Sequence, residues 1–468
     1  MSDKKKAPGQ EFEYKPKSVW DQVTEDQKKE IVNVGQDYKA FLTAAKTERL
    51  AVREIVRRAQ EAGFAELGPG KGPKKFYRNY RKKSAALVHL GAEDPTRGIN
   101  VIVSHIDSPR LDLKQRPLYE EVEIAHLKTH YYGGLKKYQW VARPLALYGL
   151  VITGDGREVE IALGDEANDP VFLVSDLLIH LAGKAQMEKK ISEALPAEKL
   201  NIICGSIPIT DTEAKERVKL AILQYLHDTY GIIEEDFISA EIEAVPAGAA
   251  RDIGFDRSMV GSYGQDDRAS SYCSLSAALS VKNPARTCAA FFLDKEEIGS
   301  EGVTGARGRI IEEVAADILA ASGKHASDAD VSAMLSRSRC ISADVNGALD
   351  PDWPEVHEKT NAALLGYGPC ITKFTGSRGK YMASDASAEL VGWVRRLFNE
   401  AGIVWQYGEL GKVDEGGGGT IAKDIAERGI DVIDIGPALL NMHSPFEISS
   451  KADIYMSCKG FRVFLESK

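Results

Sequence analysis

The chain has 468 residues, too many for one compact core, so at least two domains are expected. Its 69 Asp and Glu residues outnumber its 60 Lys and Arg residues, and the net charge of −9 argues against nucleic acid as a partner. The polar residues 1–14 lack an apolar signal core, and no stretch reaches the ~20 apolar residues that span a bilayer, so we expect a cytoplasmic protein without a membrane partner.

The first quarter of the chain predicts helices followed by buried strands. Residues 1–14 are expected to form a loose tail, and of two helical stretches that follow, the second runs from Thr47 to the stop at Gly63. The apolar run GINVIVSH then has the pattern of a buried strand and ends directly on His105, with Asp107 two residues later. His105 is therefore expected at the carboxyl end of a strand.

Residues 113–246 have a different character and predict an inserted, smaller, β-rich domain. Short runs such as LALYGLVITG and REVEIALG alternate with charged spacers, and helices are expected at 174–184 and 213–230. The flanking segments, 15–112 and 247–468, are expected to form the two parts of one larger catalytic domain.

After residue 250 strands and helices alternate. Helices are expected after Gln265, over 309–319, after Ser384 and after Thr420; the strands between them are CAAFFLD, CISADV, GIVWQYGEL and DVIDIG. This alternation predicts an α/β fold in which helices cover both faces of an open sheet. Ligands of such sheets bind beyond the carboxyl ends of the strands.

Five segments carry a carboxylate or imidazole at or just after such strand ends. The candidate ligands are His105, Asp266, Glu296 or Glu297, Asp344 and His443. Two divalent ions that share a bridging carboxylate need two imidazoles and three carboxylates, and a sixth carboxylate can transfer protons. The set therefore predicts a dinuclear metal centre that activates water for hydrolysis.

Each motif also has a simpler explanation when it is considered alone. The Glu-Glu pair could be a solvated acidic turn, and Asp266 could cap the helix that it opens. His105 could be a structural histidine, Asp344 could cap a turn, and a lone histidine such as His443 is more often not a ligand. The order of the motifs along one α/β chain favours the metal centre.

That order resembles the zinc aminopeptidase clan. The strings SHIDSPRLDLK, YGQDDRASSY, DKEEIGS, SADV and MHSPFEI resemble motifs of its M18 family, the aspartyl aminopeptidases and aminopeptidase I, and the likeness runs from about Lys83 to the carboxyl terminus. The resemblance implies a zinc-peptidase-type α/β/α sandwich with an inserted dimerisation domain. It also implies a metalloaminopeptidase that removes the amino-terminal residue of peptides.

The resemblance assigns a role to each candidate. One metal is expected on His105 and Asp344 and the other on Glu297 and His443, with Asp266 bridging them. Glu296 is expected to be the general base, and Asp107 is expected to orient the imidazole beside it. The two ions are expected to be zinc, although cobalt or manganese would suit the same donors.

In the family, a histidine of the inserted domain completes the active site of the neighbouring subunit. The segment Leu-Ile-His-Leu around His180 resembles that region, so His180 is the candidate donor to the tetrahedral oxyanion. The alternative is that a helix with leucines at 177, 178 and 181 holds His180 beside its packing face. The resemblance further implies a homo-oligomer built from dimers, expected to be a tetrahedral dodecamer.

Two further segments are candidates for substrate binding. The glycine run 416–419 lies between a strand and a helix, where the backbone of Gly418 and Gly419 can approach a substrate closely. Lys373 and Lys380 lie near where the family places a basic residue for an acidic substrate side chain; the alternative is that both are surface lysines.

The chain departs from the common family pattern at QWVARPLAL, NGALDP and EGGGG. These departures resemble a bacterial-type branch and leave the preferred substrate side chain open. Two other functions stay open: a carboxypeptidase or deacylase of the same clan, and a self-assembling shell protein without activity.

Overall fold

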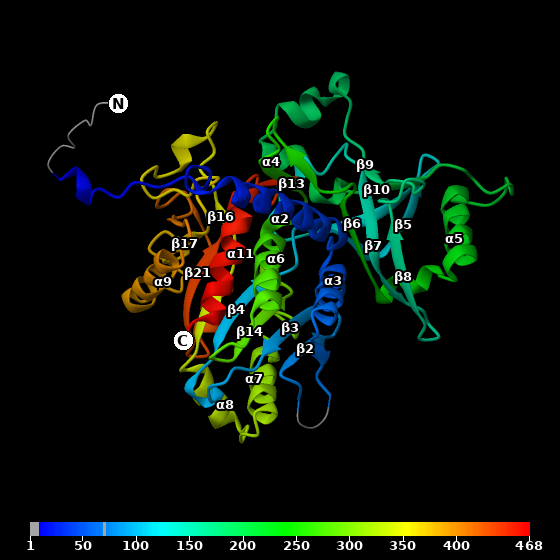
Figure 1. Ribbon diagram of the computed structural model, residues 1–468. Coiled ribbons are helices and arrows are strands. Elements are labelled where there is room, and N and C mark those ends of the chain that lie inside the picture. The colour runs from blue at the N-terminus through cyan, green and yellow to red at the C-terminus, as the bar shows by residue number, and fades with distance from the viewer. Residues whose placement is uncertain (1–8, 69–71) are drawn as a thin grey trace.

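The computed structural model describes residues 9–68 and 72–468 (Figure 1). Residues 1–8 of the predicted tail lie outside the described residues. The rest of that tail crosses the surface, where the ring of Tyr14 packs 6.5 Å from Trp405 and 5.3 Å from Tyr407 between centroids. Among the described residues, no helix combines the length and the apolar character needed to cross a membrane.

A nine-stranded mixed sheet forms the centre of the larger domain. Its spatial order is β1 (Ala65–Glu66), β2 (Lys75–Tyr80), β3 (Ser84–His89), β14 (Cys288–Leu293), β4 (Asn100–His105), β15 (Arg339–Ser342), β21 (Asp431–Gly436), β17 (Cys370–Thr372) and β19 (Gln406–Tyr407). The four strands β14, β4, β15 and β21 are parallel, so their carboxyl ends meet at one edge. They read as apolar runs because both faces of the sheet are covered.

Helices pack on both faces of this sheet. One layer contains α2 (Glu25–Ala44), α3 (Glu48–Glu61), α6 (Gln265–Ser280), α9 (Ala388–Glu400) and α11 (Lys451–Glu466), with the short α1 (Val19–Gln22) against it; the other contains α7 (Ile310–Ala321), α8 (Asp328–Leu335) and α10 (Ala422–Ala426). Side chains of β4 alternate between the two cores: Ile102 packs in the first and Val101 and Val103 in the second. The predicted α/β/α sandwich is confirmed.

The inserted domain is a separate antiparallel sheet that lies beside the sandwich (Figure 1). Its order is β8 (Glu158–Leu163), β7 (Leu145–Ile152), β11 (Ala240–Pro246), β5 (Arg110–Glu121), β6 (Ile124–Tyr132), β10 (Ile202–Gly205) and β9 (Leu173–Val174). Its core is a third apolar cluster, against which α5 (Arg217–Tyr230) packs. The predicted β-rich insertion is confirmed, whereas its exact boundaries and its role in dimerisation stay predictions.

Two small sheets carry the remaining loops of the larger domain. The first runs β12 (Arg251–Ile253), β13 (Met259–Ser262), β23 (Glu447–Ser450), β22 (Ala438–Leu440), β16 (Asn346–Gly347). The second pairs β18 (Gly376–Ser377) with β20 (Gly417–Gly418). Both lie beyond the carboxyl ends of the parallel strands, so they frame that edge.

The helix predicted at 174–184 is wrong. The segment continues from β9 as extended chain into a 3-10 turn at Ile179–Leu181 and a π-helical turn at Gly183–Met187, and α4 (Ile191–Ala194) follows. The leucines at 177, 178 and 181 are exposed, so no packed face stabilises a regular helix there. The alternative explanation of His180 as part of a packing face is therefore wrong too.

Candidate metal centre

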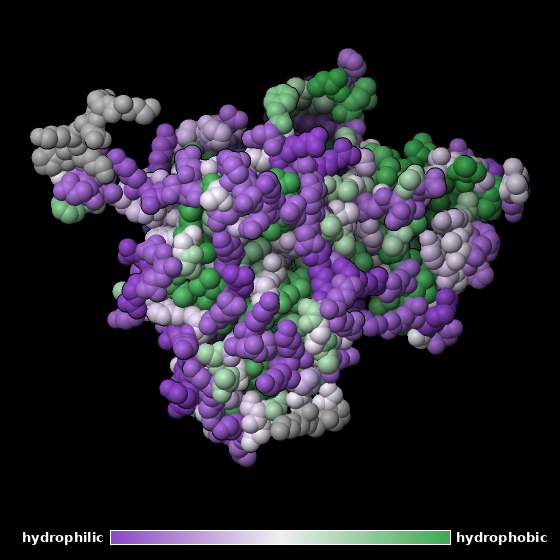
Figure 2. Space-filling model, in the orientation of Figure 1, coloured by the Kyte–Doolittle hydropathy of each residue, from purple (hydrophilic) through white to green (hydrophobic). Residues whose placement is uncertain are grey.

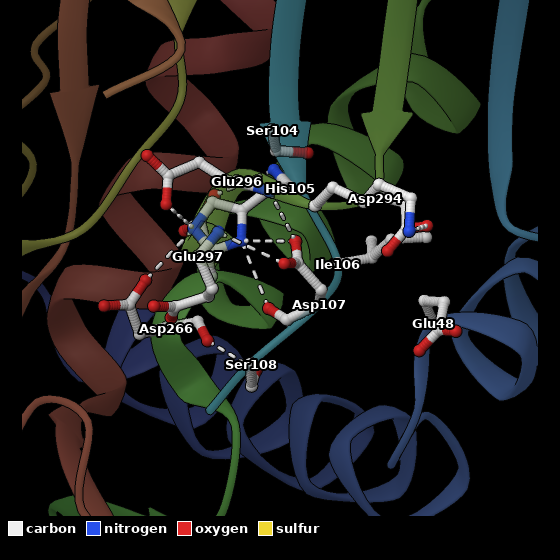
Figure 3. Close-up of polar contacts among 12 residues, drawn as sticks. Glu48, Ser104, His105, Ile106, Asp107, Ser108, Asp266, Asp294, Glu296 and Glu297 are labelled. Atoms are coloured by element: carbon white, nitrogen blue, oxygen red, sulfur yellow. Dashed lines mark hydrogen bonds and ion pairs between the residues drawn. The ribbon is translucent and has the colours of Figure 1, made fainter. Parts of the chain in front are cut away.

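The candidate ligands converge at the carboxyl ends of the parallel strands; Figure 3 labels His105, Asp266, Glu296 and Glu297 among them. His105 ends β4, Glu296 and Glu297 lie in a 3-10 turn after β14, Asp344 follows β15, Asp266 opens α6, and His443 lies between β22 and β23. Segments separated by up to 338 positions in the chain therefore meet in one place, because the parallel strands end at the same edge.

The carboxylate of Asp266 lies between the two imidazoles. Its Oδ1 is 3.2 Å from Nε2 of His105, and its Oδ2 is 3.2 Å from Nε2 of His443. Each carboxylate oxygen therefore faces a different histidine, which is the geometry that a bridging ligand requires.

The other carboxylates divide between the two histidines. Glu297 Oε2 lies 3.5 Å from Nε2 of His443, while Asp344 Oδ1 and Glu296 Oε2 lie 4.0 and 3.9 Å from Nε2 of His105. The ligand atoms of His105, Asp266 and Glu297 all lie within 4.8 Å of one another. The five predicted ligands and the predicted base therefore share one site, although their individual roles stay predictions.

The second nitrogen of each imidazole is held by an oxygen of the chain. Nδ1 of His105 donates to the carbonyl oxygen of Asp107 at 3.1 Å, and Nδ1 of His443 donates to the carbonyl oxygen of Gly134 at 2.7 Å. Both rings therefore present an unprotonated Nε2 to the centre when they are neutral, as metal-binding histidines do.

Asp107 contacts two parts of the centre: the imidazole of His105 and the turn that contains Glu296 and Glu297. Its Oδ1 accepts the backbone N–H of Glu296 at 3.1 Å, and its Oδ2 accepts the backbone N–H of Glu297 at 3.2 Å. The hydroxyl of Tyr132, on the inserted domain, donates to Oδ2 at 2.8 Å. A fully buried carboxylate with these partners fixes the direction of the neighbouring acidic side chains.

Glu447 is a buried organising residue that the sequence reasoning missed. Its Oε2 accepts the backbone N–H groups of Gln265 and Asp266 at 2.5 and 3.1 Å, and its Oε1 accepts that of His443 at 2.7 Å. The peptide bond that follows Asp266 is cis. The signal available in the sequence was the MHSPFEI string, in which this glutamate follows the histidine by four positions.

The charges of the centre suit divalent cations. Burial raises the pKa of Glu296 to about 7 and the pKa values of Glu297 and Asp344 well above their usual range. Burial opposes protonation of His443, but Asp266 outweighs it and raises the pKa of the imidazole to about 10. Buried Oε1 of Glu297 has no hydrogen-bond partner among the described residues. A metal ion would compensate these carboxylates and keep the imidazoles neutral.

A cavity of about 970 Å³ opens onto the centre and is lined by Asp266, Glu296, Glu297 and Asp344. Gly418 and Gly419 also line it, whereas their contact with a substrate stays a prediction. Lys373 and Lys380 both bind the carboxylate of Asp385, at 2.5 and 2.9 Å, and neither is among the described residues that line the cavity. Arg378, between these lysines, does line it.

His180 lies on the exposed 3-10 turn of the inserted domain and is not among the described residues that line the cavity of its own chain. Leu178, Ile179 and Leu181 around it are 53, 64 and 64% exposed. Within one chain, the structure therefore does not bring His180 to the metal centre.

Comparisons with known proteins identify the family of the chain. A sequence model of the family described as "Aminopeptidase I zinc metalloprotease (M18)" matches residues 41–465. The chain belongs to the M18 family. As an M18 zinc metalloaminopeptidase it is an enzyme, and the resemblance noted in its motifs is confirmed.

Similar M18 proteins come from several bacteria. A probable M18 family aminopeptidase 1 of Clostridium acetobutylicum is 48% identical, over 96% of this chain and 98% of its own length. The crystal structure of an M18 aminopeptidase from Thermotoga maritima, 47% identical, has a TM-score of 0.93 and covers 97% of this chain and 100% of its own. The mApe1 dodecamer of S. cerevisiae, 22% identical, has a TM-score of 0.73, with 92 and 95% coverage, and shows the shared fold.

Proposed function

We propose that this M18 enzyme uses two metal ions to release single residues from the amino termini of peptides. His105 and Asp344 would hold one ion, Glu297 and His443 the other, and Asp266 both. The observation that carries the proposal is the Asp266 carboxylate, whose two oxygens each face one imidazole at 3.2 Å. Zinc is the metal of the family description, and cobalt or manganese would suit the same donors.

Glu296 is the general base in this proposal. Bound divalent ions supply Lewis acidity and lower the pKa of water. The carboxylate of Glu296 takes a proton from the attacking water and passes it to the leaving amine. Two observations support the role: Glu296 lines the cavity with its Oε2 3.9 Å from Nε2 of His105, and Asp107 accepts its backbone N–H.

The cavity supports a peptide substrate. The backbone of Gly418 and Gly419 forms part of its wall, so a substrate can approach the main chain there without side chains between them. Lys373 and Lys380 stay candidates for binding an acidic side chain, but each would have to exchange its ion pair with Asp385 for one with the substrate. Arg378 on the cavity wall is a third candidate cation.

We also propose that the inserted domain forms a dimer contact and that His180 of a neighbouring copy donates to the oxyanion. The exposed apolar side chains around His180 support burial of this turn in an assembly (Figure 2). The yeast relative is described as a dodecamer, and we propose the same assembly here.

The direct test compares free with amino-terminally acetylated peptides as substrates for the zinc-reconstituted enzyme. We expect release of the first residue from free peptides alone. Glu296→Gln should lower kcat by about 10²–10⁴-fold while bound metal is unchanged. The control is Glu301→Gln, five positions along the same loop, whose exposed carboxylate binds Arg307.

The alternatives predict other results. Hydrolysis of acetylated peptides would favour a carboxypeptidase or deacylase of the clan. Metal binding without any turnover would favour a shell protein that keeps only the fold.

A further inference from the structure

Three consecutive residues of the inserted domain touch the metal centre from outside. Tyr132, the last residue of β6, donates its hydroxyl to Asp107 at 2.8 Å. Gly133, with φ +71°, lies where a Cβ would be 3.2 Å from Cβ of Glu297. The carbonyl oxygen of Gly134 accepts Nδ1 of His443 at 2.7 Å. The end of one strand therefore contacts both residues assigned to one metal, Glu297 and His443, and the carboxylate that orients His105, which is assigned to the other.

The ring of Tyr132 is fixed by a buried guanidinium. The carbon at the centre of the Arg110 guanidinium lies 3.9 Å from the ring centroid, and Tyr132 is only 9% exposed. Arg110 is itself held by Asp112 of β5, at 2.7 Å, by Glu243 of β11, at 3.3 Å, and by Glu48 of α3, at 3.6 Å. Because these carboxylates come from both domains, the orientation of Tyr132 depends on how the domains pack.

The hydroxyl of Tyr132 donates to the carboxylate of Asp107, which has several other hydrogen-bond partners. Asp107 Oδ2 accepts from both Tyr132 and the backbone of Glu297, while Oδ1 accepts from the backbone of Glu296 and lies 3.3 Å from Nδ1 of His105. Without the hydroxyl, a buried carboxylate loses one of its hydrogen-bond donors and can rotate toward the remaining ones. Rotation would displace a histidine and the Glu-Glu turn together.

We propose that Tyr132 is a positioning residue through which the inserted domain sets the affinity of the metal centre. The inference rests on the proposed two-metal function and goes beyond it. The insertion would then serve the site of its own chain, in addition to any contact between chains. Metal binding and packing of the inserted domain against the sandwich would be coupled through Asp107.

The test is the metal affinity of Tyr132→Phe. Phenylalanine keeps the ring beneath Arg110 and removes only the hydroxyl, so the chelator-treated protein should still fold, with an unfolding temperature lowered by no more than a few degrees. We expect zinc dissociation constants, from competition with a chromogenic chelator, to rise about 10–100-fold. At saturating zinc, kcat should fall while KM changes less than about twofold, because the hydroxyl donates to Asp107 and Tyr132 is not among the described residues that line the cavity.

The matched control is Tyr131→Phe, one residue earlier on β6, where the tyrosine is 41% exposed. It should keep the wild-type zinc affinity. Tyr132→Phe with a zinc affinity within about twofold of wild type, or an equal loss in Tyr131→Phe, would overturn the inference. If the wild-type chain bound no zinc, the proposed two-metal function would be wrong as well. Wild-type zinc binding with no change in Tyr132→Phe would contradict only the role of Tyr132, so the two failures are distinguishable.

Discussion

At the scale of single residues, buried carboxylates bind the backbone N–H groups of the segments that carry the reactive side chains. Glu447 receives three N–H groups from two chain segments, one that carries Asp266 and one that carries His443. Burial raises the pKa of its carboxyl to about 8, yet a carboxylate is the form that accepts all three donors. Glu447 therefore connects the segment of Asp266, the proposed bridging ligand, to the segment of His443, a proposed ligand near the carboxyl terminus.

Glu447→Gln should weaken metal binding without changing the direct ligands. The amide places an NH₂ group, which can only donate, against a backbone N–H of Asp266 or His443, so one of these donors is left unpaired. We expect about tenfold weaker zinc binding or more, measured by chelator competition. Glu466→Gln, at the exposed end of α11, serves as the control. Equal zinc affinity of the two variants would show that Glu447 does not organise the centre.

At the scale of elements, the strand ends explain why much of the site was predictable. Long apolar runs such as β4 and β14 are recognised from their residues alone, and a ligand that ends such a run must lie at the sheet edge. The prediction of a helix at 174–184 is wrong because the leucines at 177, 178 and 181 are exposed, so they form no packed face among the described residues. The sequence pattern did not predict Glu447 and Tyr132, because their hydrogen bonds join segments that are far apart in the chain.

The short paired strands β18 and β20 allow a prediction about the substrate site. Gly417 has φ +135°, and a Cβ there would lie 2.5 Å from the carbonyl oxygen of Gly376. Gly417→Ala should therefore push apart two loops that line the cavity. We expect KM for peptides to rise about tenfold, with unchanged zinc content.

The control for this loop is Gly392→Ala on α9, where a Cβ would meet nothing within 4 Å. Its kinetic constants should match those of wild type. A Gly417→Ala enzyme with wild-type KM would mean that the pairing of these loops does not shape the substrate site.

At the scale of the whole molecule, the proposed role of His180 in a neighbouring active site depends on the exposed turn that carries it. Its apolar side chains project from the inserted domain, where nothing in the same chain covers them among the described residues (Figure 2). Mixed assemblies can test whether one chain completes the site of another, because each defect can be placed on a different copy.

Glu296→Gln and His180→Ala chains should complement each other. In a mixed dimer, the His180→Ala chain keeps its base and receives an intact His180 from its neighbour, so one of the two sites works. Random reassociation of equal amounts should restore about a quarter of wild-type activity, because half of the dimers are mixed. Activity should be compared before and after dissociation and reassembly. Absence of recovery in verified mixed dimers would contradict a role for His180 in the neighbouring site.

The measurement that tests the two-metal account most directly is a titration of the metal-free enzyme with zinc, with bound zinc and release of the amino-terminal residue recorded together. We predict that two ions bind per chain and that full activity appears only with the second. Asp266→Asn, which removes charge from the carboxylate between His105 and His443, should lose both ions and activity. Full activity at one ion per chain, or two tightly bound ions in Asp266→Asn, would contradict a centre bridged by Asp266.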